Sequence, residues 1–246
     1  MGCAIDAPPV LPMTYYGEDE RQIWKSVEME TFQDSELDAE ERLPLHPDVS
    51  KVVHRRAYHI YEDLRVLNLY RELRWRRKQD TTNPATGDDP ICFKRQCYID
   101  HTLESLSLLP DPWVESEWER AFRLATLVFT YPASMGHDPS SSRTRYPSLR
   151  LLGLLYTTDL DAFWTSVPSL LFWILFMGAF ATQGYPERPW FVGNLVKGAM
   201  ILQTFSWSDV RAKLMDFFYL PWVHDAAFRK IWEEVEAFMA AAEASK

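Results

Sequence analysis

Cysteine is scarce in this chain of 246 residues, which contains only Cys3, Cys92 and Cys97. Three thiols cannot build the disulfide framework of a small secreted domain. Cys92 and Cys97 are separated by four residues and have no histidine or second cysteine pair close by in sequence, which favours ordinary buried thiols over a metal site. Because the start of the chain also lacks a charged–apolar–small signal segment, we expect a reducing location, cytoplasmic or else nuclear.

Positive charge is also scarce. The chain has 26 lysines and arginines against 35 aspartates and glutamates, a net charge of −9. Nucleic acids and anionic membranes attract cationic surfaces, so we expect no direct nucleic acid binding. The one compact basic run, Arg71–Lys78, is typical of cations near a helix C-terminus. A nuclear localisation signal or a phosphate-binding patch is the alternative interpretation of this run.

No apolar run is long enough for a membrane span. Residues 170–182 are free of charge and apolar on every face, but a bilayer crossing needs about 20 such residues. A helix that is apolar all round must be buried. The sequence therefore predicts a central core helix over 170–182, with Pro168 near its start and Gly184 as its stop. Gly178 would let a second helix approach closely.

Glycine is infrequent, with nine residues against 10 Trp, 11 Tyr and 14 Phe. This balance, together with the absence of convincing period-two alternation and of internal repeats, favours helices over a turn-rich β fold. We predict an all-α fold of about eight helices. Residues 1–47 are expected to form an N-terminal arm and linker, and residues 48–246 a single domain. The expected helices include 48–77, 115–129, 149–156 and 190–205, with a loop over 137–147.

Familiar cofactor and metal motifs are missing from the chain. There is no nucleotide-binding loop or glycine-rich fingerprint. Asp88 and Asp89 are consecutive in a loop, whereas a magnesium-binding pair of this kind needs carboxylates one helical turn apart. His54 and His59 are five residues apart, which does not align them on one helical face. We therefore expect neither a metal nor a cofactor.

Several motifs between about residues 113 and 237 resemble a known family. They are ERAFRLATLVF, PSLLFWILFMGAFAT, the turn PERPWFV, SWSDVRAKLMDFFY and FRKIWEEVE. Together they resemble the C-terminal regulatory domain of fungal-specific zinc-cluster transcription factors, and the PERPW turn after an apolar helix is the most specific element. The resemblance implies an all-α domain that tunes DNA-bound activators and often senses small molecules.

The chain departs from that family at its DNA-binding module. The family uses a six-cysteine binuclear zinc cluster near the N-terminus, and this chain has three cysteines in all. It cannot fold that module, because the ligands are thiolates. The chain is therefore either a fragment or a free-standing derivative with a different output.

The first functional hypothesis is a cofactor-independent cyclase or isomerase, of pericyclic or Diels–Alder type, acting on a fungal terpenoid or polyketide. An apolar pocket can hold a flexible substrate in its reactive conformer, and a hydrogen-bond donor can polarise a carbonyl. The candidate ligand-binding residues are Trp173, Phe176, Met177, Phe180, Phe218 and Trp222. The candidate catalytic donors are Tyr185, Arg188, Tyr219 and His224.

The second hypothesis is a regulator without DNA binding, derived from a fungal transcription factor, that senses an effector or pairs with a partner activator. In either case the expected ligand is a hydrophobic small molecule, and a homodimer or a partner activator is the expected protein assembly. A purely structural helical protein is the third alternative, because an apolar stripe at helical spacing is most often simple core. Arg188 has a structural alternative of its own, tying its turn to a helix C-terminus.

Overall fold

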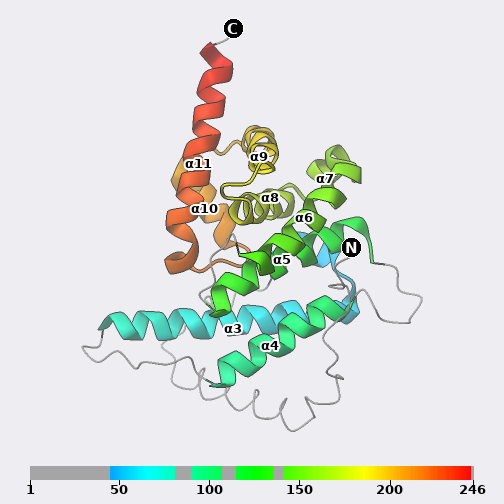
Figure 1. Cartoon of the computed structure of the whole chain (residues 1–246), viewed down its shortest axis with the longest axis vertical. Coiled ribbons are helices and arrows are strands. Elements are labelled where there is room, and N and C mark those ends of the chain that lie inside the picture. The colour runs from blue at the N-terminus through cyan, green and yellow to red at the C-terminus, as the bar shows by residue number, and fades with distance from the viewer. Residues whose placement is uncertain (1–44, 81–89, 107–114, 136–140, 245–246) are drawn as a thin grey trace. The chain divides into compact units, whose positions relative to one another are not determined.

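The computed structural model describes residues 45–80, 90–106, 115–135 and 141–244. These residues contain ten helices and no strand, so the all-α prediction is confirmed. The helices are α2 (Pro47–Val52), α3 (Arg55–Asp80), α4 (Pro90–Ser105), α5 (Glu117–Met135), α6 (Ser142–Thr157), α7 (Leu160–Ser166), α8 (Pro168–Ala181), α9 (Arg188–Leu202), α10 (Trp207–Met215) and α11 (Pro221–Ala244) (Figure 1). The predicted arm before Leu45 and the Asp88–Asp89 pair lie outside the described residues.

The chain divides into two compact units. The first contains Ala57–Pro112, and the second combines Leu45–Arg56 with Trp113–Lys246. The single domain predicted for residues 48–246 stays a prediction. None of the helices that the structure describes is long and apolar enough to cross a membrane.

Within the first unit, polar contacts join α3 to α4. The guanidinium of Arg71 donates to Gln96 Oε1 at 2.9 Å, and Arg95 forms an ion pair with Asp63. The basic run that begins at Arg71 lies in the last turns of α3, as predicted. Arg71 therefore has a structural partner inside its own unit.

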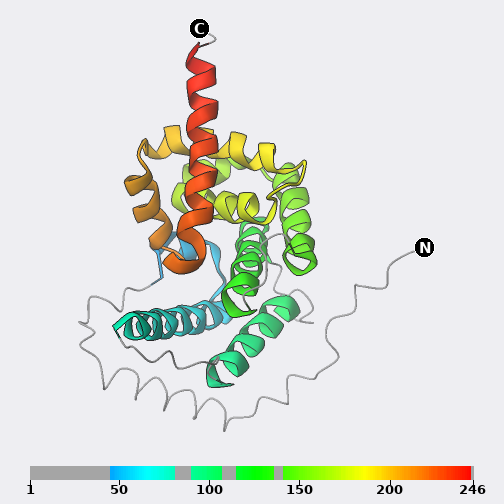
Figure 2. The same ribbon diagram turned by 60° about the vertical axis from the view of Figure 1, so that its left-hand side comes forward.

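The second unit is built around α8. Every residue of this helix from Leu170 to Ala181 is buried, and α5, α6, α9 and α11 all contact it (Figure 2). The predicted core helix is confirmed, including its start at Pro168. A Cβ added to Gly178 would lie 2.1 Å from the Phe191 ring of α9, so this glycine permits the close approach of the two helices.

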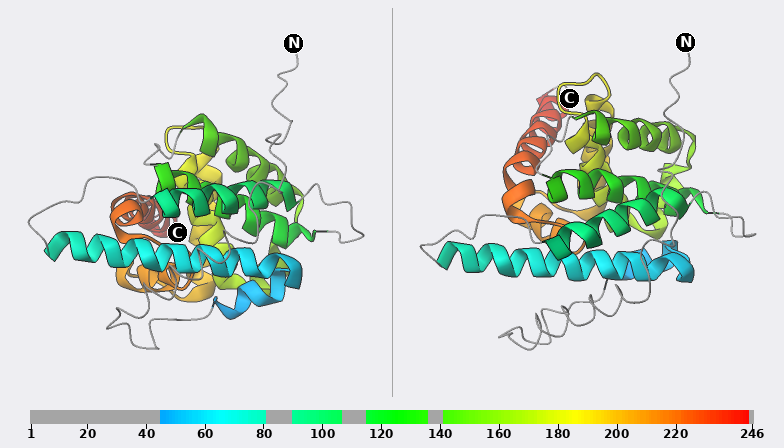
Figure 3. Two further views of the ribbon diagram at one scale, coloured as in Figure 1. Left: turned by 90° about the horizontal axis from the view of Figure 1, so that it is seen from below. Right: turned by 60° about the horizontal axis from the view of Figure 1, so that its bottom comes forward.

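Several predicted helix boundaries are wrong, and the helix expected over 115–129 continues to Met135. The helix expected over 48–77 is interrupted after α2, where the backbone of Val53 is extended. α3 then continues as one long helix (Figure 3). The loop expected over 137–147 gives way to α6 at Ser142. Pro147 lies inside that helix and is buried there, so a residue that usually ends a helical pattern instead packs into the core.

Candidate functional site

The aromatic residues predicted to bind a ligand lie mostly in the core of the second unit. Trp173, Phe176 and Met177 on α8 are completely buried, and Phe180 is 2% exposed. The indole N–H of Trp173 donates to the backbone carbonyl of Phe218 at 3.1 Å, which ties α8 to the segment before α11. These residues have the packing of a core, and their role in binding a ligand stays a prediction.

The end of this aromatic core surrounds one histidine. The rings of Phe129, Phe180, Tyr219 and Phe228 lie with their centroids 5.0–5.5 Å from the centroid of the His224 imidazole. We call these four rings and His224 the His224 cluster. They come from α5, α8, the segment before α11, and α11 itself. The fold thus brings together three predicted site residues, Phe180, Tyr219 and His224.

The hydrogen bonds of His224 indicate which of its two ring nitrogens carries the proton. The backbone N–H of Leu220 donates to Nδ1 at 3.0 Å. The carbonyl of Leu220 already accepts from the backbone N–H groups of Val223 and His224, at 3.0 and 2.9 Å. Nδ1 also lies 3.0 Å from that carbonyl oxygen, a contact in which a protonated Nδ1 would be the donor. Because the carbonyl already accepts two backbone hydrogen bonds and the Leu220 N–H has Nδ1 as its acceptor, we assign the proton of the neutral ring to Nε2. That nitrogen is buried and has no hydrogen-bond partner among the described residues.

Burial also sets the charge of His224. The side chain is completely buried, and this loss of hydration lowers the pKa of the imidazole from 6.5 to about 3. The ring is therefore neutral at neutral pH. It presents an N–H donor to the aromatic rings around it and carries no charge.

Tyr219 takes part in a separate polar network at the edge of the cluster. Its hydroxyl donates to Asp225 Oδ1, and the guanidinium of Arg211 donates to the same carboxylate at 2.8 and 3.3 Å. Burial, and then the hydrogen bond to Asp225, raise the pKa of Tyr219. Burial alone would raise the pKa of Asp225, but the hydrogen bonds from Arg211 and Tyr219 outweigh it and lower that pKa. The Tyr219 hydroxyl is therefore a neutral donor that is already engaged.

The predicted site residues Arg188, Tyr185 and Trp222 are not part of the His224 cluster. Arg188 donates to both oxygens of Glu234 at 2.7–3.1 Å and to the carbonyl of Ala179 at 2.6 Å. It thereby ties the start of α9 to α11 and to the C-terminus of α8, which agrees with the structural alternative given for it. The guanidinium carbon of Arg145 lies 3.9 Å from the centroid of the Tyr185 ring. Trp222 is 36% exposed on the first turn of α11.

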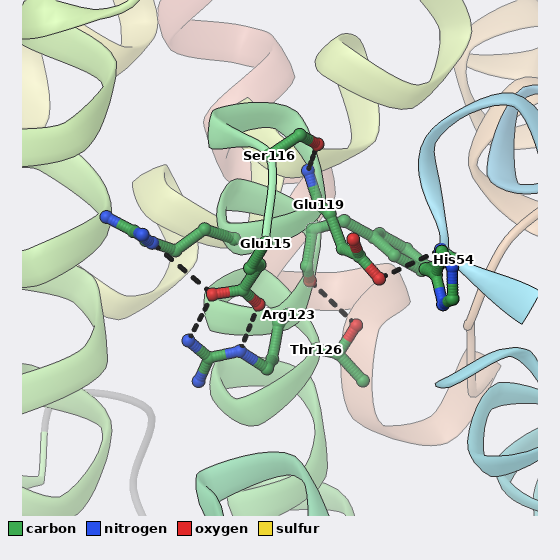
Figure 4. Close-up of polar contacts among 8 residues, drawn as sticks. His54, Glu115, Ser116, Glu119, Arg123 and Thr126 are labelled. Atoms are coloured by element: carbon green, nitrogen blue, oxygen red, sulfur yellow. Dashed lines mark hydrogen bonds and ion pairs between the residues drawn. The ribbon is translucent and has the colours of Figure 1, made fainter. Parts of the chain in front are cut away.

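A second cluster, of charged residues, lies at the start of α5 (Figure 4). Glu115 accepts from Arg123 Nε at 2.6 Å and from its Nη2 at 2.9 Å, and both side chains are at most 5% exposed. Glu119 accepts from the backbone N–H of His54 at 2.9 Å. Figure 4 shows the two carboxylates turned to opposite sides, one toward Arg123 and the other toward His54. We call Glu115, Glu119 and Arg123 the α5 charged cluster.

Burial strongly affects the pKa of Glu119. It is 2% exposed, and burial raises its pKa from 4.5 to about 7 against the opposing effect of the His54 hydrogen bond. A carboxyl group with this pKa can accept or release a proton at neutral pH. Its carboxylate also accepts the backbone N–H of His54, which lies between α2 and α3. Glu119 therefore has a structural role as well.

Sequence reasoning missed this cluster, although a signal was present. Glu119 and Arg123 are four residues apart on a helix that is otherwise buried from Ala121 to Thr130. Such spacing places both on one helical face, and a charged pair on an apolar face predicts a buried ion pair or site. No group of three or more potential metal ligands occurs among the described residues.

No family model, curated protein or solved structure matches the chain. The resemblance to the regulatory domain of fungal zinc-cluster factors therefore stays a prediction that rests on the motifs themselves. The His224 cluster and the α5 charged cluster are the features on which a functional argument can be built.

Proposed function

We propose that the chain binds a hydrophobic small molecule in the His224 cluster and that the Nε2–H of His224 donates a hydrogen bond to a carbonyl or similar acceptor of that ligand. The observation that carries the proposal is a fully buried imidazole nitrogen that has no hydrogen-bond partner within the part of the chain that the structure describes. Leaving a buried donor unsatisfied costs about 1–3 kcal/mol. A ligand acceptor would recover that cost.

The environment of His224 favours an electrostatic role over proton transfer. With a pKa of about 3, the imidazole does not accept a proton at neutral pH, and the Tyr219 hydroxyl is bound to Asp225. A neutral imidazole can still polarise a carbonyl by donating a hydrogen bond, and such a bond is stronger in an apolar surrounding than in water.

This argument leads to the narrower proposal, a cofactor-independent cyclase or isomerase. A pericyclic cyclisation moves no proton to or from the protein. It is accelerated when the substrate is held in its reactive conformer and when one carbonyl is polarised. The aromatic rings of the cluster supply the apolar wall and His224 supplies the donor. The regulatory alternative uses the same site to bind an effector without turnover.

Ligand binding at His224 requires the rings to separate. Phe180, Tyr219 and Phe228 each lie within 5.5 Å of the imidazole, centroid to centroid. We therefore expect a ligand to shift the NMR signals of Phe180 and Phe228 more than those of rings in the rest of the core.

The test is incubation of the full chain with a metabolite extract of the source organism, followed by mass spectrometry of the solution and of the protein-bound fraction. The decisive variant is His224→Asn, because the carboxamide oxygen can replace Nδ1 as acceptor for Leu220 while the Nε2–H is lost. Thr165→Ala, on the exposed face of α7, is the matched control. Circular dichroism establishes that both variants are folded.

Three outcomes separate the alternatives. If one metabolite is replaced by an isomer of equal mass with wild type and Thr165→Ala but not with His224→Asn, the cyclase proposal is supported. If a metabolite is retained unchanged by wild type and lost by His224→Asn, the protein is an effector-binding regulator. If nothing binds, or if His224→Asn binds and converts as wild type does, the proposal is wrong.

A further inference from the structure

Most of the negative charge of the chain belongs to one segment before Leu45, outside the part of the chain that the structure describes. Residues 18–41 contain ten acidic and two basic residues, a net charge of −8, compared with −9 for the whole chain. The densest part is residues 34–41, DSELDAEE, with five acidic residues in eight positions and no basic one. A block of like charge as dense as this is typical of a segment that interacts with an oppositely charged surface.

Positive charge is concentrated at the end of α3. The run Arg71–Lys78, RELRWRRK, has five cationic residues and one acidic residue in eight positions, a net charge of +4. All eight residues are helical. The acidic residue, Glu72, pairs with Arg76 at 2.8 Å. Because both partners belong to the run, this pair leaves its net charge at +4.

Two other arginines of the run contact uncharged groups. The guanidinium of Arg71 donates to Gln96 Oε1 at 2.9 Å. That of Arg74 lies 5.8 Å from the centroid of the Tyr70 ring. Each of these contacts leaves the charge of its arginine in place. The end of α3 therefore has the charge to attract an acidic partner.

The acidic segment is long enough to reach the basic run of its own chain. The 27 residues from Glu18 to Pro44 span up to about 90 Å when extended. Helix α3 rises about 24 Å between Arg55 and Arg71. A covalent connection of this length keeps the two runs at an effective concentration on the order of millimolar. Individually weak surface ion pairs then suffice for association.

We propose that the acidic segment, residues 18–41, binds the basic run Arg71–Lys78 of the same chain, with DSELDAEE opposite RELRWRRK. The contact covers the cationic end of α3 with carboxylates and so prevents that end from binding nucleic acids or anionic membranes, which need accessible cations. The basic run thereby acquires an intramolecular role that differs from a nuclear localisation signal and from a phosphate-binding patch.

The experiment is carbodiimide cross-linking of the full chain, followed by mass spectrometry. This reagent joins a carboxylate directly to an amine that it contacts, and Lys78 is the only lysine of the basic run. We expect cross-links between Lys78 and residues 34–41, with a yield that falls as salt rises from about 0.05 M to about 0.5 M. In a mixture of ¹⁵N-labelled and unlabelled protein, each cross-linked pair should carry a single isotope.

Charge reversal tests the two runs directly. The double variant Arg74→Glu with Arg77→Glu places like charges opposite each other and should lower the cross-link yield at least about tenfold. The matched control is Arg229→Glu with Lys230→Glu, which makes the same charge change at exposed positions of α11 and should leave the yield unchanged. Circular dichroism establishes that both variants are folded.

Charge exchange provides the second test. Adding Glu36→Lys and Asp38→Lys to the double variant of α3 should produce new cross-links between the exchanged positions. Three results would overturn the proposal: a wild-type Lys78 without cross-links to residues 18–41, cross-links that persist in the double variant of α3, or a fourfold variant without cross-links between the exchanged positions. Pairs that carry mixed isotopes would overturn it as well, because the acidic segment would then bind a second copy.

Discussion

His224 and Glu119 are both buried ionisable side chains of the second unit, and their pKa values shift in opposite directions. Burial favours the neutral form of each. It lowers the pKa of His224 to about 3 and raises that of Glu119 to about 7. His224 therefore stays neutral throughout the physiological range, whereas Glu119 titrates within it. His224 is therefore a hydrogen-bond donor at any physiological pH, whereas the contact that Glu119 makes depends on pH.

The surroundings of the two groups differ in the same way. The His224 cluster consists of aromatic rings, and none of the residues that the structure describes offers Nε2 a hydrogen-bond partner. The α5 charged cluster satisfies its members, since Glu115 and Arg123 share two hydrogen bonds and Glu119 accepts from His54. An unsatisfied group is a candidate for ligand binding, while a satisfied network is a candidate for fold stability. The following changes test that division, from the largest expected effect to the smallest.

Breaking the buried ion pair should have the largest effect. Removing one partner of such a pair leaves an uncompensated buried charge and costs about 3–5 kcal/mol. We expect this loss in the free energy of unfolding for Glu115→Gln and for Arg123→Met, measured by urea denaturation. Arg120→Met is the matched control, because Arg120 contacts Glu115 at 3.3 Å but is 44% exposed, and it should cost about 1 kcal/mol or less. Equal losses for Arg120→Met and Arg123→Met would contradict this account.

Adding volume to the apolar region should come next. Gly178→Ala forces a methyl group against Phe191, and overpacking of this kind costs about 1–3 kcal/mol. The methyl group of Gly193→Ala, on the exposed side of α9, meets no described residue within 4 Å. This change should therefore stabilise the helix by up to about 1 kcal/mol. Thermal unfolding of the two variants should shift in opposite directions. A neutral Gly178→Ala would show that α8 and α9 are less closely packed than described.

Two substitutions of His224 distinguish the contributions of its two ring nitrogens. His224→Phe keeps an aromatic ring but leaves the buried Leu220 N–H without its acceptor, at a cost of about 1–3 kcal/mol. His224→Asn keeps that acceptor and should cost less in urea denaturation. If the two variants are equally stable, Nδ1 is not the acceptor that the fold requires.

The smallest expected effect is on the pH dependence of stability, where Glu119 and His224 should contribute with opposite sign. The folded-state pKa of Glu119, about 7, is above its reference value of 4.5, so its contribution to stability falls as pH rises through that window. The folded-state pKa of His224, about 3, is below its reference value of 6.5, so its contribution falls as pH decreases below 6.5. The two effects oppose each other between pH 4.5 and 6.5, and only that of Glu119 remains above.

Glu119→Gln should remove the loss of stability above pH 6.5, because glutamine resembles the protonated acid and still accepts from His54. At pH 8 the variant should exceed wild type by on the order of 1 kcal/mol. His224→Asn should keep that loss and should instead remove the decline on the acidic side. Parallel pH profiles for wild type and Glu119→Gln would show that Glu119 titrates in its ordinary range.

The contrast also explains what the sequence could predict. An all-apolar run such as 170–182 has few alternatives to a buried helix, so α8 was predicted with its start. His224 and Tyr219 are predicted as hydrogen-bond donors of an apolar pocket, and the fold does bring their rings together. Arg188 was selected on the same ground, but an ion pair with Glu234, 46 residues away, engages it.

Other features depend on partners that are distant in sequence. The break after Val53 is closed by Glu119, 65 residues beyond His54, and no local pattern contains that information. The helix predicted over 115–129 does not single out Arg123, because charged residues are usually solvated. Its burial depends on Glu115, whose position just before α5 brings its carboxylate within hydrogen-bonding distance. α4 was missed because its buried positions include Gln96 and Thr102, which interrupt an apolar periodicity.

The most direct test of the central claim is the long-range ¹H–¹⁵N NMR spectrum of the histidine ring nitrogens, recorded from pH 4 to pH 8. We predict that His224 stays neutral throughout, with its proton on Nε2 and an unprotonated Nδ1 that accepts from Leu220. A ring that titrates near pH 6.5, or one that carries its proton on Nδ1, would contradict the assignment of His224 as a buried neutral donor and would remove the basis of the proposed ligand site.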